Sequence, residues 1–151
     1  MLQTIKKWLC NHLDCVDKIS PPEGLVNIDF SEVYTKLQSE FPDANILLSD
    51  NRFKTTTKAE IMRFLKGDNT DSYDYISEYF DCDDFSFSLM GKVSNQDWGC
   101  LAFGIMWTST GSGNHAVNCF IDSAGEVWII EPQNDKMFKL PNGWKPYLVM
   151  M

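Results

Sequence analysis

The amino-acid sequence predicts an α+β fold, in which helices occupy the first part of the chain and antiparallel strands the second. Two observations predict this order. Before Gly91, apolar residues recur mostly at helical spacing, whereas after Gly91 apolar runs are separated by short turns rich in glycine, serine and aspartate. The 151 residues, of which 44% are hydrophobic, are enough for one domain with a packed core.

The beginning of the chain is expected to be a short amphipathic helix followed by a linker. Apolar residues from Ile5 to Val16 recur at helical spacing, and the Ser-Pro-Pro-Glu-Gly stretch that ends at Gly24 breaks this pattern. We therefore expect an N-terminal helix and linker over residues 1–24 and a single domain over residues 25–151.

Two helices and a strand are expected next. The first helix should begin with Ser31 as its N-cap residue and end at Phe41, before a proline. The apolar residues 46–48 predict a short buried strand. Thr57 and Glu60 have the spacing of a capping box, which predicts the start of a second helix.

A third short helix is expected to begin at Cys82, and strands should form most of the remaining chain. Central and hairpin strands are indicated by continuous apolar runs and by the turn residues between them. The predicted strands cover residues 99–107, 115–121, 126–130, 137–140 and 147–149.

The charge and the cysteine content exclude several classes of protein. The chain has 13 Lys+Arg and 21 Asp+Glu, a net charge of −8, so nucleic acid would be repelled and we expect no nucleic-acid partner. The sequence contains no run of eighteen apolar residues, so no membrane span is predicted, and no signal peptide is recognisable. Five cysteines, an odd number, fit reduced thiols. We therefore expect a cytoplasmic protein.

Only two histidines can supply an imidazole for chemistry near neutral pH. His12 lies in the N-terminal segment between two cysteines at spacings that do not converge on one helical face. His115 begins one predicted hairpin strand and Glu131 ends its partner, so antiparallel pairing brings both residues to the same end of the sheet. The pair could orient a general base, or it could be an ordinary cross-strand surface pair.

Cys82 is the candidate nucleophile, because the backbone dipole at the start of a helix lowers the pKa of a thiol. The alternative is a buried, unreactive cysteine. Neighbouring carboxylates oppose thiolate formation, and a bound Ca²⁺ ion would offset them. The oxygen ligands predicted for this calcium cofactor are Asp83, Asp84, Asn134 and Asp135.

Three segments carry a resemblance to a known family. They read Cys-Asp-Asp-Phe from Cys82, Asn-His-Ala-Val-Asn from Asn114, and Trp-Ile-Ile-Glu-Pro-Gln-Asn-Asp from Trp128. Together they resemble the papain-like cysteine protease domain at the C-terminus of the Marasmius oreades agglutinin, a lectin-associated family. The resemblance extends from Leu25 to the end of the chain. The agglutinin's N-terminal sugar-binding repeats have no counterpart in this sequence, so the resemblance does not carry over a lectin function.

This resemblance implies a papain-like arrangement, with an N-terminal helical half packed on a C-terminal antiparallel sheet. It also implies a catalytic triad in which Cys82 is the nucleophile, His115 the general base and Glu131 the partner that orients the base. The activity of the family depends on calcium held near the site.

The sequence therefore predicts a calcium-dependent cysteine peptidase that hydrolyses amide bonds of a protein or peptide substrate through an acyl-enzyme. Two alternatives stay open at this point. One is a peptidoglycan amidase or endopeptidase on a related fold, and the other is a catalytically silent binding or inhibitor module. We expect no membrane partner, and the oligomeric state is open, with a homodimer as one option.

Overall fold

The structure, a computed structural model, describes residues 19–151. The predicted N-terminal helix, with His12 and its two flanking cysteines, lies outside the described residues. Among the described residues, no helix is both long enough and apolar enough to cross a membrane. The cytoplasmic location expected from the sequence stays a prediction.

The main sheet has six strands within the described part of the chain, in the order β2-β8-β4-β5-β6-β7. Neighbouring strands are antiparallel, except that β2 and β8 run parallel. The strands are β2 (Asn45–Leu47), β8 (Lys145–Met150), β4 (Phe103–Thr110), β5 (Gly113–Ile121), β6 (Val127–Glu131) and β7 (Lys136–Phe138).

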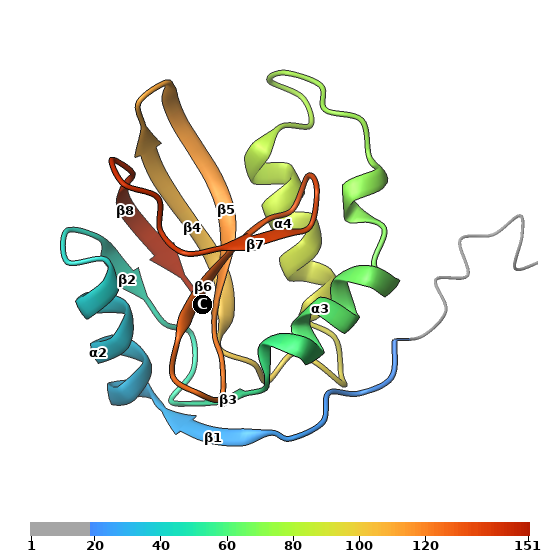
Figure 1. Ribbon diagram of the computed structural model, residues 1–151, viewed down its shortest axis with the longest axis vertical. Helices are drawn as coiled ribbons and strands as arrows, with labels where there is room; N and C mark the ends of the chain where they lie inside the picture. Colours follow the sequence, from blue (N-terminus) through green and yellow to red (C-terminus); the bar gives the residue numbers. More distant parts are fainter. Residues whose placement is uncertain (1–18) are drawn as a thin grey trace, which may run out of the picture.

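Helices cover both faces of this sheet. Figure 1 shows α2 (Phe30–Glu40) on one side and α3 (Lys58–Gly67) with α4 (Cys82–Val93) on the other. Successive residues of β5 point to opposite faces of the sheet. Cys119 packs in the core between the sheet and α2, and Phe120 packs in the core between the sheet and helices α3 and α4. The α+β class predicted from the sequence is confirmed, in a three-layer arrangement.

The edges of the fold contain short elements that the sequence patterns did not indicate. Strands β1 (Val26–Asp29) and β3 (Arg52–Thr55) form a separate two-stranded antiparallel sheet, and η1 (Thr70–Ser72) is a short 3-10 helix before α4. The predicted strand near residues 46–48 exists as β2, but it is not buried. Because β2 is the edge strand of the main sheet, its apolar side chains stay partly or fully exposed.

The start of α2 differs from the prediction by two residues. Asp29, not Ser31, is the N-cap: its Oδ1 accepts a hydrogen bond from the Glu32 N–H at 3.0 Å, and the Glu32 carboxylate accepts one from the Asp29 N–H at 3.2 Å. The Ser31 hydroxyl instead donates to Asp29 Oδ1. An ionised carboxylate is the stronger acceptor at a helix N-terminus, which explains the choice of cap.

The predicted helix that carries Cys82 is confirmed as α4. Asp81 is its N-cap, and the Asp81 N–H donates to the Asp84 carboxylate at 3.1 Å. Phe85 and Leu89 are buried against the sheet. Farther along α4, the fully buried Asn118 of β5 donates from its amide to the Ser86 carbonyl and to the Gly104 carbonyl, so it joins the helix to two strands.

Candidate functional site

Cys82 is the first residue of α4, and its thiol is partly buried beside β5. Burial raises the pKa of the Cys82 thiol, and the carboxylates of Asp81 and Asp83 raise it further. A hydrogen bond from the Ala116 N–H opposes this shift in part. The net shift of the Cys82 pKa is upward, although the position at a helix N-terminus favours the thiolate.

His115 and Glu131 are in direct contact, as the hairpin geometry predicts. The His115 Nε2 atom lies 2.7 Å from Glu131 Oε2, and both side chains are largely buried. The register pairs Asn118 with Ile130, so Glu131 lies diagonally across from His115 on the same face. An ionised carboxylate only accepts hydrogen bonds, so Nε2 carries the proton and Nδ1 is left as an acceptor when the ring is neutral.

The Cys82 thiol lies beside the strand that carries His115, next to the N–H of Ala116, and the predicted triad of Cys82, His115 and Glu131 stays a prediction. Among residues 19–151, no hydrogen bond links the Cys82 thiol to the His115 ring. The other neighbour of the His115 ring is Trp144, which packs perpendicular to it with centroids 5.8 Å apart. Trp144 in turn packs edge-on against Phe138.

A surface hollow of about 300 Å³ opens beside His115. Its lining combines an aromatic ring, an imidazole, hydroxyls, an amide and exposed backbone at the β4–β5 turn. The lining residues are Thr110, Ser112, Gly113, Asn114, His115 and Trp144. The Thr110 hydroxyl donates to the Gly113 carbonyl and accepts from the Ser112 N–H, so this turn is held in one conformation. The sequence patterns did not indicate Trp144 as a site residue, because its contact with His115 joins distant parts of the chain.

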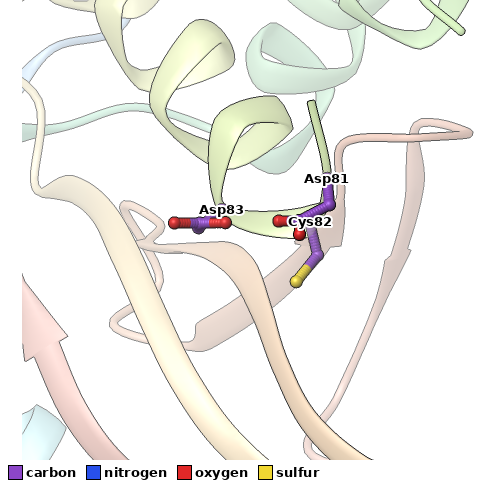
Figure 2. Close-up of side chains that lie close together, drawn as sticks. All are labelled: Asp81, Cys82 and Asp83. Carbon is purple, nitrogen blue, oxygen red and sulfur yellow. The ribbon is translucent and has the colours of Figure 1, made fainter. Parts of the chain in front are cut away.

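The predicted calcium ligands fall into separate groups. Figure 2 shows Asp83 with Asp81 and Cys82 at the first turn of α4, where their ligand atoms lie within 4.8 Å of one another. A hydrogen bond with the Asp81 carboxyl group raises the pKa of Asp83. Asp84, in contrast, accepts the capping hydrogen bond from the Asp81 N–H. Asp81 was not among the predicted ligands, although it directly precedes the cysteine.

Asn134 and Asp135 lie in the turn after β6. The Asn134 side chain accepts a hydrogen bond from the Lys136 N–H within this turn. Burial raises the pKa of Asp135 to about 6, and the nearby carboxylates of Asp71 and Asp68 raise it as well. Asp135 is therefore associated with the loop before α4, while Asp83 is associated with Asp81. That the four residues bind one Ca²⁺ ion stays a prediction from the sequence.

Cys82 is expected to react slowly with iodoacetamide at neutral pH. Because its pKa is raised, its thiolate fraction should keep increasing above the ordinary thiol range of about pH 8.5. Peptide mapping by mass spectrometry over a pH series measures the rate, with the exposed Cys100 as the internal comparison. Alkylation of Cys82 well ahead of Cys100 at neutral pH would contradict this description of the thiol.

The fold and the site together define a three-layer α+β domain with a polar and aromatic hollow at one end of its main sheet. Residues 53–137, more than half of the chain, match the family model described as Agglutinin C-terminal. The chain therefore belongs to the agglutinin C-terminal family. A comparison with curated proteins gave no match.

Two solved structures are similar to the chain over 83% of its length. One is described as the PSL1a-E64 complex, with 27% identity and a TM-score of 0.74. The other is the Polyporus squamosus lectin bound to the human-type influenza-binding epitope Neu5Acα2-6Galβ1-4GlcNAc, with 26% identity and a TM-score of 0.71. The match covers 51% and 49% of those chains, so this chain spans about half the length of the proteins it resembles.

These comparisons correct part of the interpretation from sequence. The family model is described as an agglutinin domain, and one of the two structural neighbours is a lectin in complex with a carbohydrate. The expectation of a cysteine peptidase with a protein or peptide substrate is corrected accordingly. The alternative of a catalytically silent binding module fits better.

Proposed function

We propose that the chain is a carbohydrate-binding module and that the hollow beside His115 and Trp144 holds the sugar. The observation that carries this proposal is the composition of the hollow. It presents an aromatic ring next to hydroxyl, amide and imidazole groups, in a hollow of about 300 Å³. Ligand sites of this kind combine apolar contact with a few well-placed polar groups that fix the orientation of the ligand.

Each part of the hollow has a role that its chemistry supports. A pyranose ring has an apolar face of C–H groups, which can pack against the Trp144 ring. Sugar hydroxyls both donate and accept, and they can bond to the Asn114 amide and to Nδ1 of His115. The Glu131 carboxylate holds the His115 ring in one orientation through the 2.7 Å contact, so Glu131 is a positioning residue.

The Polyporus squamosus lectin supports this proposal as a relative that binds a carbohydrate. Because the match covers about half of that protein, the carbohydrate binding of the whole lectin is carried to this chain only as a proposal. The papain-like arrangement, in which the helix of Cys82 packs on the sheet of His115 and Glu131, likewise stays a prediction from the sequence.

Calorimetric titration of the chain with a panel of neutral and sialylated oligosaccharides tests the proposal. We expect at least one member of the panel to bind with a stoichiometry of one, and the recovered glycan to be unchanged. A parallel incubation with a peptide library is expected to leave the peptides intact. Cleavage that is lost in Cys82→Ala would overturn the proposal of a binding module.

We further propose that Asp81 and Asp83 bind a Ca²⁺ ion. Their carboxyl groups share a hydrogen bond, which raises the pKa of Asp83 and lowers that of Asp81. Two carboxyl groups this close, with ligand atoms within 4.8 Å, provide the hard oxygen ligands that calcium prefers. A bound cation would remove their mutual repulsion at the first turn of α4.

Calcium is therefore expected to stabilise the folded chain. A saturating Ca²⁺ concentration should raise the melting temperature by about 3 °C or more relative to EGTA at matched ionic strength. Mg²⁺ should have a smaller effect, because it retains its water ligands. In Asp83→Asn the increase should disappear, whereas the exposed Asp43→Asn, with the same change in charge, should keep it. An equal increase in both variants would exclude the proposed site.

A further inference from the structure

The negative charge of the chain is concentrated in one segment. Residues 68–91 contain seven carboxylates and no lysine or arginine, so this segment carries −7 of the net charge of −8. It includes the loop before α4 and most of α4 itself. The carboxylates are Asp68, Asp71, Asp74, Glu78, Asp81, Asp83 and Asp84.

The same segment forms a second, larger hollow on the surface, with a volume of about 600 Å³. This volume lies within the range of about 300–1,000 Å³ that is typical of ligand sites. The lining of the hollow contains aromatic and aliphatic side chains together with hydroxyl groups and a carboxylate. The lining residues include Tyr73, Asp74, Ile76, Tyr79, Phe80 and Ser88. None of them lines the hollow beside His115.

Two aromatic residues of this hollow, Tyr73 and Tyr79, are exposed but held in place, and Phe80 is half-buried beneath them. Ile76 and Phe80 exchange two backbone hydrogen bonds of 2.9 and 2.7 Å, and this tight loop holds the Tyr79 side chain out at 82% exposure. Phe80 packs edge-on against the buried Phe85 of α4, with centroids 4.9 Å apart. Tyr73 packs against Phe80 in the same way at 5.6 Å. The core therefore supports an exposed aromatic surface.

Exposed aromatic rings with hydroxyls can bind the C–H faces and hydroxyl groups of sugar rings. The surrounding carboxylates then determine which sugars are favoured, because they attract cations and repel anions. Lys92 lies over the Tyr73 ring, but its charge is paired with Asp68 at 3.0 Å. The local field at the Tyr79 side of the hollow is therefore negative.

We propose that this hollow binds oligomers of amino sugars that carry free ammonium groups, with Tyr79 and Tyr73 packing against the sugar rings and Asp74 pairing with an ammonium group. Neutral N-acetylated oligomers would keep the aromatic contacts but lose the ion pair. Sialylated oligomers would be repelled. The proposal does not depend on the function assigned to the hollow beside His115, since the two hollows share no residue.

The test is a calorimetric titration of the full chain at about pH 6, where the amino sugar is charged. We expect a pentamer of β-1,4-linked glucosamine to bind about tenfold more tightly than its fully N-acetylated form, and its affinity to fall with added salt. Tyr79→Ala and Asp74→Asn should each weaken binding by about tenfold. The matched controls Tyr147→Ala and Asp43→Asn, both exposed positions outside the hollow, should leave the affinity unchanged.

Three outcomes would overturn the proposal. Equal affinity for the charged and N-acetylated pentamers would mean that the carboxylates do not contribute. Binding of a lysine pentamer as tightly as the glucosamine pentamer would mean that charge alone is recognised. Equal losses in Asp74→Asn and Asp43→Asn would mean that net charge decides the affinity. Trp144→Ala should leave the affinity for the glucosamine pentamer unchanged, because Trp144 does not line this hollow. This variant therefore distinguishes binding here from binding in the hollow beside His115.

Discussion

Gly104→Ala is expected to lose a large part of the stability of the fold. A Cβ atom at position 104 would lie 2.0 Å from the Met150 carbonyl oxygen and 2.9 Å from its carbonyl carbon. These are backbone atoms of the neighbouring strand β8, so no side chain can rotate away to make room. The strand would have to move, and the Asn118 hydrogen bond to the Gly104 carbonyl would move with it.

The cost should be about 3 kcal/mol or more, a large part of the total stability of a typical domain. Urea unfolding followed by circular dichroism measures it. Gly91→Ala is the matched control, because a Cβ at this helical position meets nothing within 4 Å. It should stabilise the chain by about 0.5–1 kcal/mol, since alanine favours the helix over glycine. An unchanged unfolding midpoint in Gly104→Ala would contradict the close approach of β4 and β8.

Trp144→Ala is expected to have the largest effect on sugar binding. The ring lines the hollow and packs perpendicular to His115, so its loss removes both the aromatic contact with the sugar and one support of the imidazole. Aromatic residues that anchor a ligand contribute about 2 kcal/mol or more, which corresponds to a loss of affinity of about 30-fold.

The same titrations compare three variants. Trp144→Phe should retain part of the affinity because it keeps an aromatic ring, and Tyr147→Ala should retain all of it, since Tyr147 does not line the hollow. Thermal melts confirm that each variant is folded. If the folded Trp144→Ala variant binds the oligosaccharide as tightly as the unmodified chain, the Trp144 ring is not part of the sugar site.

The parts of the site that depend on local pairing could be predicted from the sequence. His115 and Glu131 come from the two strands of one hairpin, so the turn signal at residues 122–125 was enough to predict their contact. The start of α4 at Cys82 was likewise predictable from short-range helix signals. In both cases the interacting residues are close in sequence or joined by one turn.

The parts that depend on distant contacts could not be predicted. Asp135 adopts a left-handed conformation with φ of 57° in the turn after β6 and is associated with Asp68 and Asp71, which no spacing rule indicates. The exposure of β2 depends on its place at the edge of the sheet, which follows from strand order and not from its apolar residues. The protonation of Cys82 depends on burial and on neighbouring carboxylates as well as on the helix dipole.

The most direct test of the account is a nuclear magnetic resonance titration of the isotope-labelled chain with the oligosaccharide that binds best in calorimetry. The account predicts saturable shifts of the Trp144 indole and the His115 ring signals, with the glycan unchanged at the end of the titration. Saturable binding that leaves both of these signals in place, or no shift of any signal at millimolar glycan, would contradict the claim that this hollow binds carbohydrate.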